Sequence, residues 1–471
     1  MRPATEDRVF NNWIDLAFNT LKRGVLKQLQ QCDDAESFES IESNLQALFV
    51  ECERQVLEKT LSELDVNVPS LEIDGTRCRQ VLRDKMTYYS SAGPLRIERS
   101  LYRARGAAIT QCPLEQKAGI VERRWTPRAA KQAVFAVSQL TPYEAQALFA
   151  ELGRMTPSRS SLDRLPKKLG AQWEGNRSEF EASLRDYEIP MLATSVAVSL
   201  DGVKVPMQGG VVLPGDSRYE EASCGSITFY DKDGEPLLTR RYGRMPESHK
   251  LTTKAFLKAE IDHALSLRPD LQLVKVADGA KDNWTFLDSE LPAGLSVLDF
   301  YHATEHLKNG FDLIFGKDSA ESHGQFTHYR HRLRHEVNGI DAVIRCLAQY
   351  VRKKPKSTAL KAELNYFKNN KHRCQYATTA EQHFPIGSGI VEATCKTLVA
   401  QRLKRSGMAW QTIGGQAILT FRALLQSHQF DQGWALLSKK YKADVKMPGM
   451  WCQLKKGYRK SSETDLHPID F

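Results

Sequence analysis

The alternation of apolar and polar residues divides the chain into a helical N-terminal part, a central part rich in strands and a helical C-terminal part. Up to about residue 65, apolar residues recur at helical spacing, as at Leu57, Leu61 and Leu64. Residues 87–102 instead predict two strands joined by a turn at Gly93-Pro94, and therefore a β-hairpin. The arginines of its second half either follow a phosphate backbone or guard an exposed sheet edge: Arg96, Arg99, Arg103 and Arg105.

Three threonines, each followed by proline, predict helix starts between residues 126 and 165. Thr126, Thr141 and Thr156 are capping residues, and proline is favoured at the first helical position. The second and third helices are separated by a short turn that contains Gly153, which indicates a helix-turn-helix for DNA binding. Helix pairs are also common without that role. If the role holds, the second helix presents these side chains to a DNA groove: Ser158, Arg159, Ser161 and Arg164.

From about residue 194 the pattern changes to short apolar runs typical of strands. The runs cover residues 196–200, 226–230, 236–242, 271–277 and 295–298. Helical patterns stand between the last three runs, the first of them with Thr252 or Thr253 as its cap. The order β-β-β-α-β-α-β is that of the ribonuclease H-like fold. A doubly wound nucleotide-binding fold begins instead with alternating strands and helices.

Residues 307–384 carry helical periodicity and many charges, which predicts an α-helical insertion into this core. A long helix then follows Gly387-Ser-Gly389, from Val391 to about Leu403. The predicted organisation is an N-terminal helical region (1–78), a β-hairpin segment (79–125), a helix-turn-helix-like DNA-binding region with a linker (126–190), the first part of the α/β core with a mixed five-stranded sheet (191–306), the insertion (307–384), the core helix with Glu392 (385–428) and a basic C-terminal tail (429–471).

Composition adds limits on compartment and cofactors. The chain has 471 residues, enough for two to four domains, and 41% of them are hydrophobic. It lacks an uninterrupted apolar stretch of membrane-spanning length, and its charged start is unlike a signal peptide. Nine scattered cysteines without a CxxC pair argue against a disulfide framework or a zinc ribbon. We therefore expect a bacterial cytoplasmic, nucleoid-associated protein without a membrane partner.

Positive charge gathers towards the C-terminus. The net charge is +9, and residues 393–460 hold 13 lysines and arginines against two acidic residues. Such a segment favours binding to a polyanion, most often nucleic acid, although a solvated basic face gives the same pattern. Trp410 is a further candidate for base stacking, with packing on the core as its alternative. The candidate DNA-binding residues here are Lys396, Arg402, Lys404 and Arg405.

Carboxylates at strand ends indicate metal chemistry. Asp201 ends the first predicted strand and Asp278 the fourth, and these strands are neighbours in a sheet of this order. Glu392 lies in the first turn of the helix that follows Gly389. Three such oxygen donors suit Mg²⁺ or Mn²⁺, and a pair of ions about 3.5–4 Å apart is the usual device for phosphodiester chemistry. The competing interpretation is that both Asp-Gly pairs are simple turns.

Asp299 and His302 form a second pattern, one helical turn apart after the fifth strand. They either brace the site or contact substrate, or Asp299 is a plain helix cap. The motifs of a nucleophile elbow, a P-loop and a dinucleotide fold are absent from the sequence.

Four segments together resemble insertion-sequence transposases of the ISKra type, which are related to Mutator-like DDE transposases. They are Ser199-Leu-Asp-Gly-Val-Lys-Val, Val276-Ala-Asp-Gly-Ala-Lys-Asp-Asn-Trp284, Val297-Leu-Asp-Phe-Tyr-His-Ala-Thr-Glu-His-Leu307 and Gly387-Ser-Gly-Ile-Val-Glu-Ala-Thr-Cys-Lys396. The resemblance covers roughly residues 80–430. It implies a ribonuclease H-like core, Mg²⁺ dependence, and cleavage and transfer of DNA strands at the ends of the element.

Within this resemblance the first acid of the triad matches Asp201 and the last matches Glu392. The second acid is either Asp278, which the strand order favours, or Asp299, which the Asp-x-x-His pattern with His302 also matches. The implied partners are double-stranded DNA, as terminal repeats and target, and further copies of the chain in a dimer or higher oligomer. Two rival functions stay open: a non-catalytic DNA-binding regulator that keeps the fold, and a structure-selective nuclease.

Overall fold

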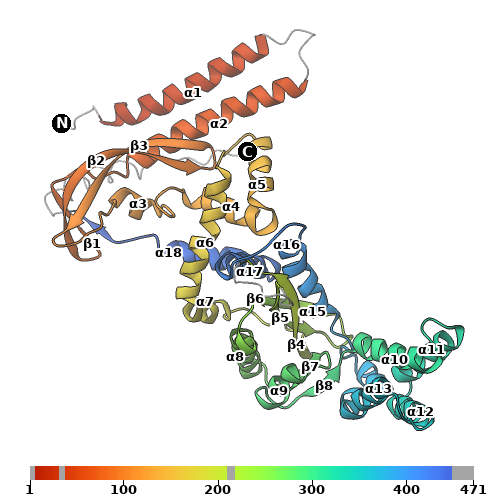
Figure 1. Cartoon of the computed structure of the whole chain (residues 1–471). Helices are drawn as coiled ribbons and strands as arrows, with labels where there is room; N and C mark the ends of the chain where they lie inside the picture. Colours follow the sequence, from red (N-terminus) through yellow and green to blue (C-terminus); the bar gives the residue numbers. More distant parts are fainter. Residues whose placement is uncertain (1–5, 31–37, 209–217, 448–471) are drawn as a thin grey trace. The chain divides into compact units, whose positions relative to one another are not determined.

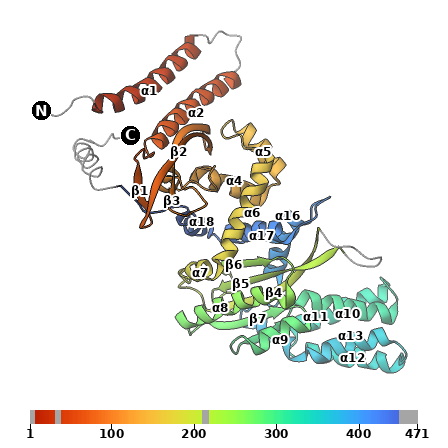
Figure 2. The ribbon, with the colours of Figure 1, turned by 60° about the vertical axis from the view of Figure 1, so that its left-hand side comes forward.

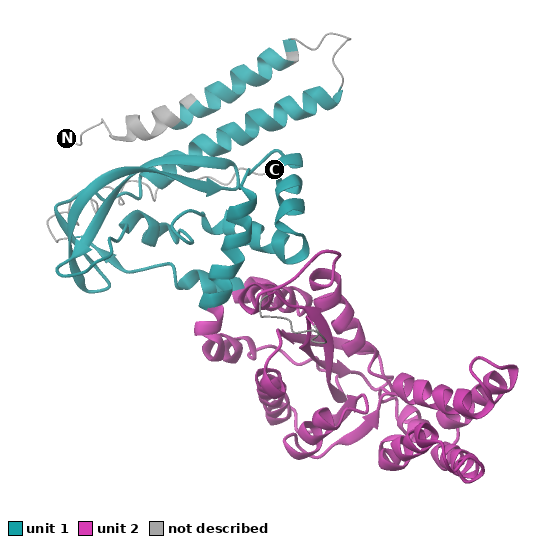
Figure 3. Ribbon diagram, in the orientation of Figure 1, with its two compact units in different colours: residues 1–172, 434–471 teal, residues 173–433 magenta. Residues whose placement is uncertain are grey.

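The computed structural model describes residues 6–30, 38–208 and 218–447 (Figure 1). The chain separates into two compact units, shown in different colours in Figure 3. Unit 1 combines residues 1–172 with 434–471, and unit 2 covers residues 173–433. Residues 448–471, which make up most of the predicted basic tail 429–471, lie outside the described residues.

Unit 1 contains an antiparallel sheet with strand order β3-β2-β1-β9. Its strands are β1 (Ser70–Ile73), β2 (Thr76–Ser90), β3 (Gly93–Ala104) and β9 (Val445–Lys446). β2 and β3 form the predicted hairpin, but it is longer than the pattern indicated and its turn is displaced. Gly93 and Pro94 open β3 instead of forming the centre of the turn, because Ser90 already pairs with Gly93 across the ladder. Ser90 Oγ also donates to the Gly93 carbonyl at 2.7 Å.

One hairpin arginine has a structural role. Arg99 is only 11% exposed and forms ion pairs with Asp84, at 2.9 Å, and with Glu115. Its guanidinium also donates to the hydroxyl of Tyr88. These contacts occupy Arg99, so it is not placed along a phosphate backbone.

Unit 1 also contains these helices, in chain order: α1 (Glu6–Gln30), α2 (Phe38–Ser62), α3 (Pro113–Ala118), α4 (Pro127–Gln139), α5 (Pro142–Glu151) and most of α6 (Arg159–Gly175). Thr126 and Thr141 precede helices as predicted, and Thr141 forms a capping box with Glu144. The prediction for Thr156 is wrong. Ser158 is the residue whose hydroxyl accepts the free backbone N–H of the first turn, from Ser161 at 3.2 Å.

Unit 2 is built on a mixed five-stranded sheet with strand order β6-β5-β4-β7-β8. Its strands are β4 (Ser195–Pro206), β5 (Tyr219–Tyr230), β6 (Pro236–Arg244), β7 (Gln272–Ala277) and β8 (Leu295–Leu298). β5 runs antiparallel to both β4 and β6, whereas β4, β7 and β8 are parallel. With α8 (Leu251–Leu267) before β7 and α9 (Lys281–Ser289) before β8, the predicted order of elements is confirmed.

β4 continues past the point where the sequence pattern ends it. Its antiparallel ladder with β5 runs from Ser195 to Pro206, so Asp201 lies in the middle of the strand. The parallel ladder with β7 stops earlier, at Ser199 opposite Val276. Asp201 therefore stands just beyond the end of the parallel part of the sheet, although the strand itself goes on.

Helices cover both faces of this sheet. A Cβ on Gly225 would meet Leu257 of α8, and one on Gly243 would meet Leu398 of η3 (Cys395–Ala400). Figures 1 and 2 show α8 on one side and α17 (Thr412–Gln426) on the other. The start of α8 differs from the prediction: the side chain of Glu247, not a threonine, accepts the first N–H groups, from Thr252 and Thr253.

The insertion is helical throughout. Its helices are α10 (Phe300–Phe315), α11 (Ala320–His335), α12 (Gly339–Lys353), α13 (Thr358–Asn369) and α14 (Tyr376–Glu381). The chain then returns to the sheet as α15 (Gly389–Thr394), η3 with π-helical bonding and α16 (Gln401–Leu403), followed by α17 and α18 (Phe430–Lys439). Figure 2 shows α10–α13 packed as one bundle beside the part of the sheet that contains β7.

Among the described residues, none of the helices is long and apolar enough to cross a membrane. The described cysteines are all free thiols, and six of these seven are buried. Cys32 and Cys452 lie outside the described residues.

Candidate active site

Three aspartates stand at the same level of three adjacent parallel strands. Ser199 of β4 lies opposite Val276 of β7, so Asp201 falls level with Asp278 two residues later. Ala277 lies opposite Leu298 of β8, so Asp278 is in turn level with Asp299. The parallel register thus gathers three carboxylates at one edge of the sheet.

Asp201 is held by short polar contacts under the helix that follows Glu392. Its Oδ1 accepts from the Gly202 backbone N–H at 2.6 Å, and its Oδ2 from the Cys395 thiol at 3.4 Å. Burial raises the pKa of the Asp201 carboxyl above its usual value, and the negative charge of Asp278 adds to the shift. The ammonium group of Lys250 opposes it. An ionised Asp201 is therefore favoured by added positive charge.

Asp278 joins β7 to β4 through an asparagine. Its Oδ1 accepts from the Ala280 backbone and from the side chain of Asn283, each at 3.1 Å. Asn283 is buried and also donates to the Leu200 carbonyl of β4 at 3.2 Å. In the described part of the chain the other oxygen, Oδ2, accepts no hydrogen bond. Asp278 thus has one fixed oxygen and one available for a ligand.

Asp299 is fully buried and has both oxygens occupied. Oδ1 accepts the His302 backbone N–H at 2.7 Å, which makes Asp299 the N-cap of α10. Oδ2 accepts the backbone N–H of Ser388, in the loop before Glu392. The helix-cap interpretation of Asp299 is confirmed, and the second bond ties the cap to the loop before α15.

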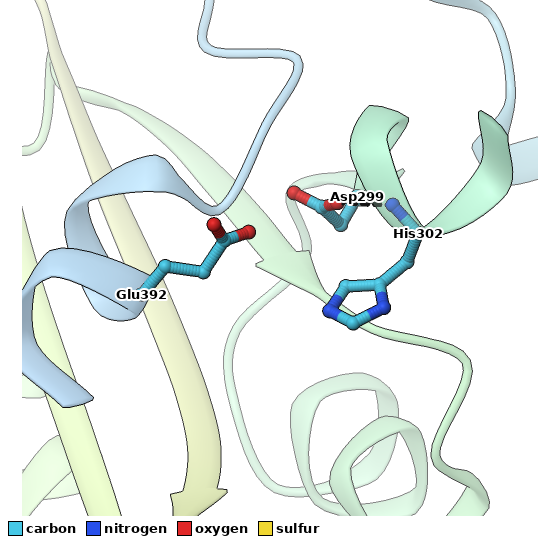
Figure 4. Close-up of side chains that lie close together, drawn as sticks. All are labelled: Asp299, His302 and Glu392. Atoms are coloured by element: carbon cyan, nitrogen blue, oxygen red, sulfur yellow. Dashed lines mark hydrogen bonds between the residues drawn. The ribbon is translucent and has the colours of Figure 1, made fainter. Parts of the chain in front are cut away.

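Glu392 faces Asp299 and His302 from the opposite side, as Figure 4 shows. One ligand atom each from Asp299, His302 and Glu392 lie within 4.8 Å of one another. Ser388 Oγ donates to Glu392 Oε1 at 2.9 Å and so sets the direction of its side chain. Glu392 is exposed and His302 is half-buried, so this group opens to solvent while Asp299 closes it from behind.

Among the described residues, the ligand atoms that come together belong to Asp299, His302 and Glu392, and Asp201 and Asp278 are not part of this group. The four carboxylates are hard oxygen donors of the kind that Mg²⁺ or Mn²⁺ prefers, whereas the imidazole of His302 also suits zinc. Crowding of Asp201 and Asp278 is unfavourable while both are ionised, and a cation between them removes that cost. Asp278 also keeps the unoccupied oxygen that a ligand position requires.

Tyr366, a tyrosine from the insertion, lies beside the acidic site. The sequence pattern did not reveal it. The Tyr366 hydroxyl is buried and has no hydrogen-bond partner among the described residues. Its ring lies where a Cβ on Gly279 would stand, only 2.4 Å from Cε2. Burial raises the pKa of the Tyr366 phenol, and the charges of Asp278 and Asp299 contribute.

His306 fixes that ring. The two rings stack with centroids 3.6 Å apart, and His306 Nδ1 lies 2.7 Å from Glu363 Oε2. His306 follows His302 by one helical turn, and this spacing is the only signal of its role in the sequence. Tyr366 lies 87 positions after Gly279, and no local pattern connects them.

The predicted DNA-binding residues of unit 2 differ in exposure. Lys396, Lys404 and Arg405 are exposed. Arg402 is 2% exposed, and its guanidinium lies 5.2 Å from the centre of the Trp410 ring. Trp410 itself donates to the Leu403 carbonyl at 2.9 Å. The packing interpretation of Trp410 therefore holds, and Arg402 belongs to the same packed cluster.

The predicted helix-turn-helix residues lie on or just before α6, in unit 1. Three of them are exposed: Ser158, Arg159 and Arg164. Ser161, also predicted to face DNA, is 9% exposed.

Neither a protein-family model nor a curated protein matches the chain. Among solved structures it is similar to the Drosophila P element transposase strand transfer complex. That similarity has 12% sequence identity and a TM-score of 0.25, and it covers 72% of this chain and 88% of the other. A similarity at this level identifies neither a family nor an activity, so inference about function rests on the site itself.

Proposed function

We propose that the chain is a DNA transposase of the DDE type, which cuts and joins DNA at the ends of an ISKra-type insertion sequence. One observation carries the proposal: Asp201, Asp278 and Asp299 stand level on adjacent strands, and Glu392 faces Asp299 and His302 from α15. The strand order β6-β5-β4-β7-β8, with β5 antiparallel, supports a ribonuclease H-like core.

Asp201, Asp278 and Glu392 would hold Mg²⁺ or Mn²⁺, two ions in all, and are the proposed triad. Asp278 is preferred to Asp299 because its Oδ2 is available, whereas both Asp299 oxygens already accept backbone N–H groups. Such ions, when bound, activate the attacking oxygen and stabilise the leaving oxygen of a phosphodiester.

Asp299 and Ser388 act as positioning residues in this scheme. Asp299 holds the Ser388 N–H, and the Ser388 hydroxyl holds Glu392, so α10 and α15 keep a fixed separation. Pre-set carboxylates need not reorganise during the reaction, which is the main way a protein accelerates phosphoryl transfer.

Tyr366 is proposed to contact the DNA substrate. Its buried hydroxyl lacks a protein partner and lies close enough to Asp278 and Asp299 for their charges to act on it. An orphan donor beside an acidic cluster suits a non-bridging phosphate oxygen. The stacked ring of His306 holds Tyr366 in that direction.

The reaction needs no oxidant or reductant. In cleavage, a water oxygen bonds to phosphorus, the bond from phosphorus to the 3′-oxygen breaks, and the water proton balances the new 3′-hydroxyl. In strand transfer, that 3′-oxygen bonds to a target phosphorus and the target's 3′-oxygen leaves with the proton.

Three basic residues of unit 2 are suited to the phosphates of the DNA backbone. Lys396, Lys404 and Arg405 are exposed. Two DNA ends would be paired in a dimer or higher oligomer of the chain.

The test is strand transfer with a pre-cleaved duplex that carries the terminal repeat flanking the gene, in Mg²⁺ or Mn²⁺. Wild type is expected to give joined product, and Asp278→Asn to lose at least about a hundredfold in rate, as expected for loss of a charged transition-state contact. Asp282→Asn is the matched control, because among the described residues its exposed side chain forms an ion pair only with Lys254. Tyr366→Phe is expected to lower the rate about tenfold.

Three outcomes separate the alternatives. Binding to the repeat without joining in either metal would identify a regulator. Cutting of duplexes without preference for the repeat would identify a nuclease. Loss of joining in Asp299→Asn but not in Asp278→Asn would show that Asp299 is the second acid of the triad.

A further inference from the structure

Unit 1 contains a cavity of about 310 Å³ that the acidic site does not involve. It lies between the end of β2, the segment 122–125 and the first turns of α6. Its volume is at the lower end of the range for small-molecule sites. Ser158 and Arg164, predicted from sequence to face DNA, both line it.

The cavity carries uncompensated positive charge. Arg124 and Arg164 line it, are exposed, and form no ion pair with a carboxylate in the described part of the chain. The third cation, Lys168, is paired with Glu122 at 2.9 Å. Glu122 also accepts from the Tyr441 hydroxyl at 2.7 Å, so this carboxylate is already neutralised. Two arginines are therefore left to meet an anion, and guanidinium groups match phosphate geometry.

An aromatic wall faces those arginines. Tyr89 and Trp125 pack with ring centroids 4.6 Å apart, and Trp125 is buried behind the half-buried Tyr89. The backbone of Tyr89 bonds to Arg124 and Thr126, at 2.7 and 2.9 Å. Tyr89 is thus held rigidly, which lowers the entropy cost of stacking a ligand ring on it.

Hydroxyl groups connect the two sides. Ser158 Oγ donates to Ser161 Oγ at 2.9 Å, and Ser161 Oγ lies 3.5 Å from the Tyr89 hydroxyl. An aromatic surface, a row of hydroxyls and two guanidinium groups without a carboxylate partner are the features that recognise a base, a sugar and a phosphate respectively.

We propose that this cavity binds one unpaired nucleotide of a DNA strand, with its phosphate at Arg124 and Arg164 and its base against Tyr89. A paired base cannot enter, because its partner and its stacked neighbours hold it in the duplex. The choice of DNA rests on the proposed function, but the site would bind a single strand whether or not the acidic site is active. It would hold a frayed or extruded nucleotide.

Binding of a fluorescein-labelled short oligothymidylate to the full chain, followed by anisotropy, tests the phosphate contacts. Arg124→Gln and Arg164→Gln are each expected to raise Kd several-fold and to lower the slope of log Kd against log salt by about 0.7, the value for one phosphate contact on a single strand. Arg159→Gln is the matched control, since Arg159 is exposed on the same helix but lies outside the cavity lining. An equal change of Kd in all three variants would overturn the proposal, because it would indicate binding to a general basic surface.

A base-free oligomer of the same length tests stacking. Wild type is expected to bind it about tenfold more weakly than oligothymidylate, the effect of one stacked base. Tyr89→Phe should keep this preference and Tyr89→Ala should lose it, with circular dichroism verifying that both fold. Equal binding of the two oligomers by wild type would overturn the proposal.

The catalytic variant Glu392→Gln separates the two proposals. It should bind oligothymidylate as wild type does while strand transfer is lost. If the chain joins DNA normally, but Arg124→Gln, Arg164→Gln and removal of the bases leave Kd unchanged, the proposed function stands and the proposal for the cavity fails. The chain could also bind a blunt duplex more tightly than the single strand, with Arg159→Gln weakening that binding as much as Arg124→Gln and Arg164→Gln do. That result would assign α6 to recognition of a DNA groove instead.

Discussion

The Asp299 carboxylate accepts a hydrogen bond from the backbone N–H of Ser388, 89 positions further along the chain. Its other oxygen caps α10 at His302, so one buried side chain joins the start of the insertion to the loop that carries Glu392. The geometry of the acidic site therefore depends on a residue whose own oxygens are occupied.

This relationship predicts a stability effect for Asp299→Asn. An amide has only one acceptor oxygen, so its NH₂ group must face one of the two N–H groups that Asp299 now satisfies. Leaving a buried donor unsatisfied costs about 1–3 kcal/mol, and the midpoint of urea unfolding should fall accordingly. Asp278→Asn keeps an oxygen for Ala280 and Asn283 and should unfold close to wild type. A wild-type midpoint for Asp299→Asn would contradict the positioning role.

Ser388→Ala tests the second half of the connection. The backbone N–H to Asp299 survives, whereas the 2.9 Å bond from Ser388 Oγ to Glu392 is lost. We expect strand transfer to fall about tenfold, equivalent to about 1.4 kcal/mol, with thermal unfolding nearly unchanged. Ser266→Ala is the control, because in the described part of the chain that exposed hydroxyl donates only to the His263 carbonyl of the same helix. Unaltered joining by Ser388→Ala would mean that Glu392 is oriented by other contacts.

Gly279→Ala tests the packing of the insertion against β7. Its new methyl group would stand 2.4 Å from Tyr366 Cε2, so the stacked ring must move. Overpacking of this kind costs about 1–3 kcal/mol, and displacement of Tyr366 should also slow strand transfer. Urea unfolding and a joining assay measure the two effects.

Gly324→Ala serves as the opposite control. A Cβ there meets nothing within 4 Å, and Gly324 lies inside α11, so alanine should stabilise by about 0.5–1 kcal/mol. The double variant Gly279→Ala with Tyr366→Ala should recover part of the lost stability, because the clash is removed. If Gly279→Ala alone is neutral, Tyr366 does not press on β7.

The order of the central strands was predictable because each buried strand is a local run of aliphatic residues. Asp278 follows such a run and lies where the pattern predicts. Asp201 does not end its strand, because residues 219–225 of β5 supply an antiparallel partner that no property of residues 196–206 announces. The turn interpretation of Asp201-Gly202 fails for the same reason.

Features that depend on particular side-chain contacts were not predictable. Glu247 replaces the expected threonine cap of α8, since its side chain reaches forward to two N–H groups after an intervening 3-10 turn. Tyr366 contributes an orphan hydroxyl from a helix whose sequence is ordinary. Arg402 is basic, as the charge pattern requires, yet it is buried against Trp410. Charge counts register such a residue but cannot show which way it points.

A divalent cation should reverse the order of stability of wild type and Asp278→Asn. Without metal, the charge of Asp278 disfavours ionised Asp201, so removing that charge should leave the variant at least as stable as wild type. With Mn²⁺ at about a hundred times its Kd, a ligand that binds only the folded state adds about 2.7 kcal/mol to wild type. The variant should gain much less, and wild type should then be the more stable.

Thermal unfolding with and without Mn²⁺, after treatment with EDTA, measures this reversal. Asp282→Asn should gain as much stability from Mn²⁺ as wild type does, because its partner Lys254 lies outside the proposed triad. If Mn²⁺ stabilises Asp278→Asn as much as wild type but fails to stabilise Asp299→Asn, the cation is held by Asp299 with His302 and Glu392 instead. Because Asp299 would then ligate the ion while it also holds Ser388, cation binding would tighten the connection between α10 and α15 directly.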